Sequence, residues 1–448
     1  MERHLVIPDY LVEFRCLGPT CSFNCCHNYW TVEIDTELYA DLHAAMAGTP
    51  ADRRILEERF PLDDTATPTV HRRTAPPEEA HCPFLQPDCR CRIHADYGEE
   101  LLPVVCRIFP RYYQSTRQGL LARGTLACPE IARLALTAAA EPVLLRLTAA
   151  DGPGRHREPS ARWRSADEPD PADRASAQIL EAIWELLEPG RHPFPFALFV
   201  AGVLARQIDA GTPPADAAAA PADPEWLSEL RASYDTARLA AHSPLQSAWT
   251  TLTALTRFRS ASIGHSIRAA LNSYPGIERA PAPPAAGAGP AADDEAAGTC
   301  GGTTSATMAV LCRRRAAVEA ACPGRVAGYW RRFSRHHLFG IAPVDGGKLL
   351  EQIMILAHYL AMLDILLHGQ PVVQALAGET DDAPADAAAA LDQAVTETVA
   401  RFARITTHNQ SLQVRMHDYM HGLGPFGMGG LLTRLYFLET GRTSREGR

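Results

Sequence analysis

The feature that most constrains this chain is a dense group of cysteines near its N-terminus. The stretch Phe14–Trp30, FRCLGPTCSFNCCHNYW, holds four thiols within eleven residues, and four further cysteines follow in the fragments CPFL, CRIH, CRIFPR and CPE. In a reducing compartment, thiols at this density are usually ligands for a soft metal or an iron–sulfur cluster rather than plain core residues. The eight candidate ligands are Cys16, Cys21, Cys25, Cys26, Cys82, Cys91, Cys106 and Cys128.

The composition is that of a soluble globular protein. The chain has 448 residues, of which 46% are apolar and 21% charged, and its formal net charge is −9. This acidic balance argues against a general nucleic-acid binder. Met1–Arg15 has no uninterrupted apolar stretch of the kind found in signal peptides. The longest apolar run, Ile353–Leu367, is broken by His358 and Asp364 and is shorter than the ~20 residues that a membrane helix needs. We expect a cytoplasmic protein with no membrane span, in which this run is a buried helix.

The cysteines divide the chain into unlike parts. Nine of the 12 precede residue 130, whereas helical apolar spacing recurs through much of the rest. We predict a mainly α fold, in which a cysteine-rich region of loops and short strands packs on an α-helical domain. The predicted divisions are a cysteine-rich region over residues 1–150, a helical region over 174–277, a disordered low-complexity linker over 278–304 and a helical C-terminal region over 305–448.

Several local signals predict individual elements. Prolines keep the second cysteine block, His81–Arg111, from being one long helix, so it is expected to fold into short turns. Ala and Pro dominate Gly211–Asp223, which we interpret as a linker. The other expected elements are a short strand near Tyr29–Ile34, a helix that begins around Asp35, a helix over Arg53–Phe60, a strand over Leu120–Leu126 and a helix from Pro129 to about Ala140.

Three interpretations of the cysteines stay open. The first is buried thiols without a metal, because cysteine is among the most buried residue types. The second is structural zinc, but zinc usually uses two C-x2-4-C hooks and only Cys21 and Cys25 form one here. The third, which we favour, is an iron–sulfur cluster held by four of the thiols, with the other four structural or serving a second metal. A cluster that generates radicals from S-adenosylmethionine is not predicted, because its CxxxCxxC loop would need a cysteine at Asn28.

In these motifs the chain resembles the bacterial flagellin lysine N-methylases. A smaller class of zinc- or iron-chelating proteins shares only the CC…CPFL…C…CR-FP core. A late family element, R-x-x-E-H-N, is similar to ARFARITTHNQS through Arg404, His408 and Asn409, with Thr407 in place of the glutamate. The pieces that carry the resemblance are CLGPTCSFNCCHNYWTVEID, CPFLQPDCRCRIHADYGEELLPVVCRIFPR and CPEIARLAL.

The resemblance implies an enzyme that methylates lysine side chains of a protein. The methyl donor would be S-adenosyl-L-methionine, the protein substrate would be flagellin, and the cysteines would hold a [4Fe-4S] cluster, with zinc as the alternative metal. The alternative function is a non-enzymatic zinc- or iron-binding protein that uses the same cysteines.

Methyl transfer to an amine requires a neutral lysine nitrogen. Free lysine has a pKa near ~10.4, so the site must favour loss of this proton through desolvation or a base. The candidate bases are His408 and Tyr419, with Asp418 as an orienting carboxylate, and the family element adds Arg404 to the candidate catalytic residues.

Other C-terminal patterns carry less information. Gly422–Gly427 spells GxGxxG but follows a helical stretch rather than a strand, so a dinucleotide site is not predicted. His417 and His421 have the spacing of a metal pair, although solvated histidines are the plainer interpretation. A basic run could contact an acidic cofactor or protein, but such runs usually form a solvated helix face. Its residues are Arg331, Arg332, Arg335, His336 and His337.

Overall fold

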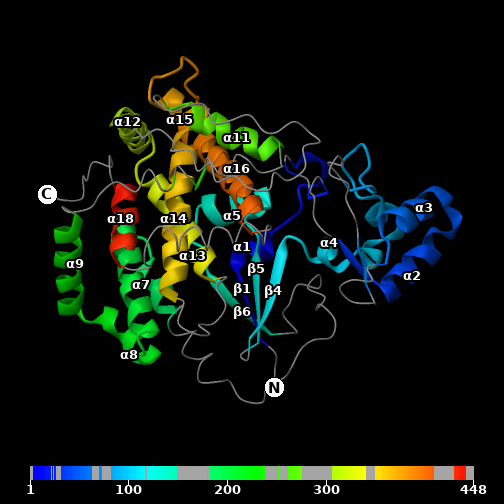
Figure 1. The fold of residues 1–448 in the computed structure, drawn as a ribbon, viewed down its shortest axis with the longest axis horizontal. Coiled ribbons are helices and arrows are strands. Elements are labelled where there is room, and N and C mark those ends of the chain that lie inside the picture. Colours follow the sequence, from blue (N-terminus) through cyan, green and yellow to red (C-terminus); the bar gives the residue numbers. More distant parts are fainter. Residues whose placement is uncertain are drawn as a thin grey trace, which may run out of the picture. The chain divides into compact units, whose positions relative to one another are not determined.

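A computed structural model describes the fold of the chain outside several gaps. The described residues are 4–21, 23, 25–26, 32–62, 70–72, 82–116, 119–148, 179, 181–238, 248, 251–252, 261–274, 305–339, 349–407 and 428–439. The fold is mainly α-helical, as predicted, with a small sheet formed by the N-terminal part of the chain (Figure 1).

The chain divides into two compact units. Unit 1 comprises Met1–Ser115, Gly119–Ile131 and Val143–Arg164, and unit 2 comprises Thr116–Gln118, Ala132–Pro142 and Ser165–Arg448. The predicted boundary near residue 150 and the predicted linker over 278–304 lie outside the described residues, so those divisions stay predictions.

The N-terminal part of the chain combines short strands, short helices and tight turns. The strands are β1 (His4–Pro8), β2 (Glu33–Asp35), β3 (Val70–Arg72), β4 (Arg111–Thr116), β5 (Gly119–Gly124) and β6 (Leu144–Thr148). The helices are α1 (Asp9–Glu13), α2 (Thr36–Ala45), α3 (Pro50–Arg59), α4 (Val104–Ile108) and α5 (Pro129–Thr137). The turns are η1 (Gly18–Thr20), η2 (Met46–Gly48), η3 (Ile93–Tyr97) and η4 (Glu99–Leu101).

Four strands form one sheet in the order β4-β5-β1-β6 (Figure 1). Strand β1 lies parallel to β5, with Leu5 opposite Leu120, and antiparallel to β6, with Leu5 opposite Leu147. The strand predicted over Leu120–Leu126 is confirmed as β5. The sheet as a whole was not predicted, because β1 is only five residues long and its partners are distant in sequence.

A hydrophobic core around α2 and α3 in unit 1 supports the cysteine-bearing segments. The helix expected to begin around Asp35 is confirmed as α2, and the Asp35 carboxylate caps it by accepting a hydrogen bond from the Leu38 N–H at 2.8 Å. The expected turns of the second cysteine block are also present, as η3, η4 and α4. The buried members of this core are Val32, Ile34, Leu42, Met46, Leu56, Phe60, Phe84, Ile93 and Leu102.

Unit 2 consists mainly of helices. Its elements are α7 (Phe194–Asp209), α8 (Pro214–Ala219), η5 (Ala220–Ala222), α9 (Pro224–Arg238), α11 (Ala261–Asn272), α12 (Ser305–Ala321), α13 (Arg325–Phe339), α14 (Leu349–His368), α15 (Pro371–Leu376), α16 (Ala387–Thr407) and α18 (Met428–Glu439). The interpretation of Gly211–Asp223 as a linker was wrong, because the alanines that follow Pro213 form α8 and η5. Alanine is the best helix former, and a proline at the first position of a helix is well tolerated.

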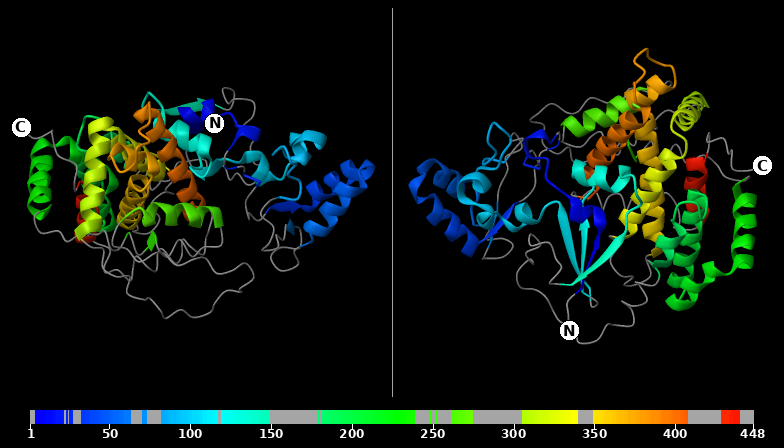
Figure 2. Two further views of the ribbon diagram at one scale, coloured as in Figure 1. Left: turned by 90° about the horizontal axis from the view of Figure 1, so that it is seen from above. Right: turned by 180° about the vertical axis from the view of Figure 1, so that it is seen from behind.

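Helix α14 is the centre of unit 2. Within that unit it contacts α7, α16 and α18, which lie around it in Figure 1 and in both views of Figure 2. It is long and apolar enough to cross a membrane by length and composition alone, yet 78% of its most apolar window is buried. The carboxylate of Asp209 caps its start by accepting the Leu349 and Leu350 N–H groups at 3.2 and 3.1 Å. The prediction of a buried helix is confirmed.

In the basic run on α13, Arg331 and Arg335 are buried and the other three residues are half-buried, so its interpretation as a solvated face was wrong. Arg331 donates to the carbonyl oxygens of Glu188 and His192 at 2.9 and 3.0 Å. Arg332 and Arg335 both pair with Glu141, at 2.9 and 3.1 Å. These guanidinium groups satisfy carbonyl groups at chain turns, which sequence spacing alone does not reveal.

Candidate metal and functional sites

Four of the predicted metal ligands come together in unit 1 from three chain segments. The thiol of Cys26 interacts electrostatically with those of Cys25, Cys82 and Cys91. The backbone fixes this arrangement, because the Cys82 N–H donates to the Cys26 carbonyl at 2.7 Å. Cys91 is held near the same turn by an antiparallel bridge to Leu85. We call these four cysteines the first thiol set.

The first thiol set rests on the core formed around α2 and α3. Cys82 and Cys91 pack against that core. The segment that follows Cys91 is tied to α3 through the Asp52 carboxylate, which is only 1% exposed. That carboxylate accepts hydrogen bonds from Arg92 Nη1 at 2.6 Å and from the Tyr97 hydroxyl at 2.8 Å. A buried acceptor with two donors therefore positions this part of the thiol set.

Burial and neighbouring thiols raise the pKa of two members of the first set, Cys26 and Cys91. A hydrogen bond with Cys25, together with burial and the other thiols, raises the pKa of Cys26 well above its usual range. Burial is the main cause that raises the pKa of Cys91, although backbone N–H groups of His94 and Ile93 oppose it. A soft cation would replace these protons, because metal ligation requires thiolates. The donor type, thiol sulfur, is the one that a thiolate-bound metal or an iron–sulfur cluster requires.

A second thiol set contains Cys16, Cys21 and Cys128. The pKa of Cys128 is raised to about 12, mainly by burial and to a smaller extent by the thiols of Cys21 and Cys16. Cys128 immediately precedes α5, and its sulfur accepts hydrogen bonds from the backbone N–H groups of Ile131 and Glu130, which favour the thiolate. This set supplies three sulfurs from two segments of unit 1.

Of the other cysteines in this region, Cys106 is exposed on α4 and Cys89 occupies a turn with a φ of +63°. None of the eleven described cysteines forms a disulfide. Among the described residues, no three His, Cys, Asp or Glu side chains close around a common point as a finished ion site would. The thiol sets are therefore neighbourhoods of donors, and the ligand roles of all eight cysteines stay predictions.

The candidate catalytic residues are described only in part. Arg404 is half-buried near the end of α16. His408, Asp418 and Tyr419 lie outside the described residues, as do His417 and His421. Whether Arg404 meets the two candidate bases therefore stays a prediction.

Unit 2 holds buried ion pairs that sequence reasoning missed. Arg315 and Asp364 are both fully buried and pair at 2.5 Å, and Trp330 Nε1 donates to the same carboxylate at 2.9 Å. These contacts connect α12, α13 and α14. A signal did exist, because Asp364 interrupts the longest apolar run of the chain, but its partner depends on how the helices pack.

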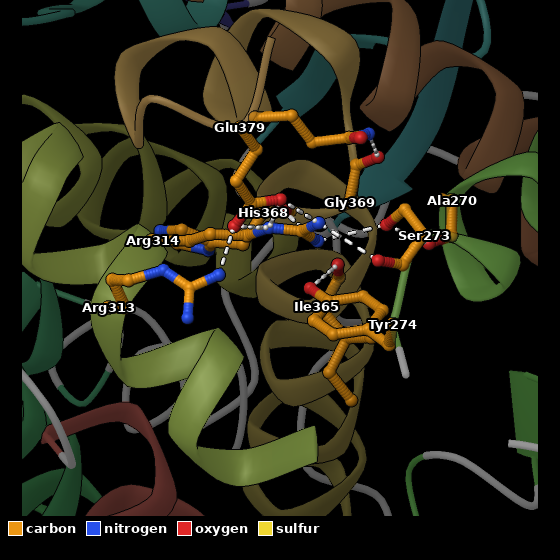
Figure 3. A network of polar contacts seen from close by, with 10 residues as sticks. Ala270, Ser273, Tyr274, Arg313, Arg314, Ile365, His368, Gly369 and Glu379 are labelled. Atoms are coloured by element: carbon orange, nitrogen blue, oxygen red, sulfur yellow. Dashed lines mark hydrogen bonds and ion pairs between the residues drawn. The ribbon is translucent and has the colours of Figure 1, made fainter. Parts of the chain in front are cut away.

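A second guanidinium, that of Arg314, is surrounded by acceptors (Figure 3). It bonds to Glu379 at 2.6 Å, to the side chain and carbonyl of Ser273 at 2.9 Å each, and to the His368 carbonyl at 3.1 Å. It also lies 4.7 Å from the centre of the Tyr274 ring. All of its nitrogens are engaged, so Arg314 ties α11, α12 and α14 together rather than offering a binding group.

A buried histidine completes the polar core of unit 2. His358 Nε2 lies 3.0 Å from the Thr251 hydroxyl, and Arg434 Nε donates to His358 Nδ1 at 3.4 Å. Burial, reinforced by the charge of Arg434, lowers the pKa of His358 to about 3. The ring is therefore neutral at physiological pH, which makes it a structural hydrogen-bonding group.

Comparison with known proteins gives partial matches. Over 124 residues, 28% of this chain, it is 27% identical to the flagellar biosynthetic protein FliU of Salmonella muenchen and covers 72% of that protein. Over the same length it is 26% identical to the lysine-N-methylases of Salmonella choleraesuis and Salmonella typhimurium, of which it covers only 30%. No family model and no solved structure matches the chain. The chain is weakly related to these proteins.

Proposed function

We propose that this chain transfers a methyl group from S-adenosyl-L-methionine to lysine side chains of a protein, and that flagellin is the substrate. The observation that carries the proposal is the partial match to two lysine-N-methylases. The match to a flagellar biosynthetic protein supports the choice of substrate. The resemblance of the cysteine motifs to flagellin lysine N-methylases points to the same reaction.

The proposal includes a [4Fe-4S] cluster in unit 1, for which the first thiol set supplies four sulfurs. Methyl transfer to a neutral amine needs no redox step, so such a cluster would supply a structural cross-link between chain segments. The side chains of this chain would then serve as ligands and as supports for the segments that carry the ligands. Cys25, Cys26, Cys82 and Cys91 would hold the segments together, and the Asp52 carboxylate would hold the Cys91 segment on α3.

The acceptor lysine must lose a proton before it attacks the methyl group. In this proposal His408 or Tyr419 takes that proton from the lysine Nζ, and Arg404 helps to position them. The Nζ lone pair then forms the new C–N bond while the bond from the methyl carbon to the donor sulfur breaks, which leaves S-adenosylhomocysteine. The sulfonium charge of the donor is neutralised in that step, so no further co-reactant is needed.

The direct test is mass spectrometry of flagellin after incubation with the anaerobically purified chain and methyl-deuterated S-adenosylmethionine. Labelled methyl groups on lysines support the proposal. The His408→Ala variant should label flagellin far more slowly. The Cys89→Ser variant, which changes a cysteine outside the eight candidate ligands, should retain activity. Unlabelled flagellin, under conditions in which the chain is folded and metal-loaded, would contradict the proposal.

A second candidate is a non-enzymatic zinc- or iron-binding protein. The observation that favours it is the gathering of thiols in the described part of unit 1. Calorimetric titration with S-adenosylmethionine separates the candidates, because a metal-binding protein without this activity has no need of the methyl donor. Metal content that is retained without any donor binding would favour this second candidate.

A further inference from the structure

Arg123, on β5 of the unit 1 sheet, differs from the other arginines discussed above. Arg315 and Arg314 each pair with a carboxylate, as their burial requires. Arg123 is half-buried, yet its guanidinium makes neither an ion pair nor a hydrogen bond with any part of the chain that the structure describes. Within the described residues it is a partly desolvated cation without a counter-charge.

The described neighbours of Arg123 are aromatic, and no acidic side chain is among them. Its guanidinium carbon lies 5.5 Å from the centre of the Tyr112 ring, on the neighbouring strand β4. The hydroxyl of the buried Tyr10, on α1, is its other electrostatic neighbour. None of the four strands contains an aspartate or glutamate, whereas β4 contributes Arg111 and β6 contributes Arg146. The sheet thus carries arginines and no acidic side chain.

The position of Arg111 leaves Arg123 as the cation beside Tyr112. Arg111 is adjacent to Tyr112 in β4, so strand alternation places it on the opposite face, where its guanidinium lies 5.2 Å from the Phe14 ring. Arg123 therefore shares its face of the sheet with Tyr112 and not with Arg111.

An unpaired cation in this setting costs free energy. Burial lowers the pKa of Arg123, as the charged form loses hydration that nothing in the described chain replaces. Proteins retain such groups where a ligand completes them, so perturbed and unpaired charges often mark binding sites. The ring of Tyr112 shields one face of the guanidinium. Its N–H groups have no acceptor among the described residues.

We propose that Arg123 binds a carboxylate group of a ligand at this face of the unit 1 sheet. A guanidinium donates two parallel hydrogen bonds to a carboxylate. The inference deepens the proposed function and rests on it for the class of anion. The methyl donor carries an amino-acid carboxylate and a protein substrate carries acidic side chains, whereas neither supplies a phosphate.

Calorimetric titrations test this on the full-length, metal-loaded chain. The variants are Arg123→Gln, Arg123→Lys and a matched control, Arg54→Gln. Arg54 is a 73% exposed arginine of unit 1 with only a surface pair to Glu58 at 3.8 Å. We expect Arg123→Gln to weaken S-adenosylmethionine binding by roughly 10-fold or more, as expected for a lost charge-assisted pair. The affinity of Arg123→Lys should lie between those of Arg123→Gln and the unaltered chain. Arg54→Gln should bind S-adenosylmethionine as the unaltered chain does.

Methylthioadenosine, which lacks the amino-acid part of the donor, identifies the group that Arg123 binds. Its affinity should be the same in the Arg123→Gln variant as in the unaltered chain. If S-adenosylmethionine binding is also unchanged, flagellin is titrated instead, and weaker binding by Arg123→Gln than by Arg54→Gln would assign the carboxylate to the protein substrate. Unchanged affinity for both ligands would overturn the proposal, as would a response to inorganic phosphate alone.

The S-adenosylmethionine and flagellin titrations distinguish failure of this inference from failure of the proposed function. If the unaltered chain does not bind S-adenosylmethionine, the proposed function fails, while the flagellin titration still decides the role of Arg123. If the unaltered chain binds neither ligand, this inference fails too.

Thermal unfolding without ligand distinguishes a binding role from a structural one. Removing an unpaired cation should leave the melting temperature of Arg123→Gln equal to or above that of the unaltered chain. A fall of several degrees, with no fall in Arg54→Gln, would mean that Arg123 supports the fold and would overturn the proposal.

Discussion

The Asp52 carboxylate offers the sharpest test of how unit 1 holds its first thiol set. It is 1% exposed and accepts two hydrogen bonds, from Arg92 at 2.6 Å and from the Tyr97 hydroxyl at 2.8 Å. In Asp52→Ala the tyrosine and the arginine lose this acceptor at once. Arg92 and Tyr97 belong to the segment that follows Cys91, so the same change should loosen that cysteine.

The size of the effect follows from these contacts. A hydrogen bond to a charged group contributes about 1.5–3 kcal/mol, and breaking a fully buried ion pair costs about 3–5 kcal/mol. Arg92 is 36% exposed, so water recovers part of its loss. We therefore expect Asp52→Ala to lower the free energy of unfolding by about 2–3 kcal/mol, or roughly 4–12 °C in melting temperature for a unit of this size.

The assay compares thermal unfolding and metal content of Asp52→Ala with those of Asp41→Ala. Asp41 is an exposed carboxylate on α2, so its replacement makes the same change in charge at the surface. Asp52→Ala should melt several degrees lower and retain less metal, and Asp41→Ala should match the unaltered chain. Equal melting temperatures for the two variants would refute the idea that a buried acceptor positions the Cys91 segment.

Three further predictions concern unit 2. Asp364→Asn should lower the free energy of unfolding by about 3–5 kcal/mol, because it leaves the Arg315 cation buried without its counter-charge; a change below about 1 kcal/mol in denaturant titrations would contradict this. His358 has a pKa lowered to about 3 in the folded chain, below its unfolded value of ~6.5, so its contribution to stability is complete above pH ~6.5 and is lost as the pH falls towards 3. His358 contributes up to about 1.4 kcal/mol per pH unit to the slope of unfolding free energy against pH, and this contribution should disappear in His358→Gln. An unaltered slope would argue against a buried neutral ring. Gly202→Ala should destabilise the chain by about 1–3 kcal/mol, because the added Cβ would clash with Leu431 Cδ2 where α7 meets α18; unaltered thermal unfolding would show that this contact relaxes freely.

The sequence predicted features that depend on local chemistry. Cysteine density indicated a region of gathered thiols, and prolines indicated that the block around Cys82 and Cys91 folds as turns. The carboxylate of Asp35 identified the start of α2, and apolar length identified α14 as a buried helix. The proline, cap and apolar-length signals lie within the segments whose structure they predict.

Features that depend on distant parts of the chain were not predictable in the same way. Strand β1 is recognisable only through β5 and β6, which lie more than a hundred residues later. The basic run on α13 has the pattern of a solvated helix face, and only the fold reveals its carbonyl partners around Glu188. The setting of Arg123, which has no acidic partner in the described part of the chain, could not be recognised from sequence, because it depends on which strands pair in the sheet.

Metal and sulfide analysis of the anaerobically purified chain tests the central claim most directly, namely that the first thiol set holds an inorganic centre. The account predicts about four irons with acid-labile sulfide per chain. It also predicts that Cys91→Ser loses most of both, while Cys89→Ser, in the same turn region, keeps them. A chain with a single zinc and no sulfide, or iron content that Cys91→Ser leaves unchanged, would contradict it.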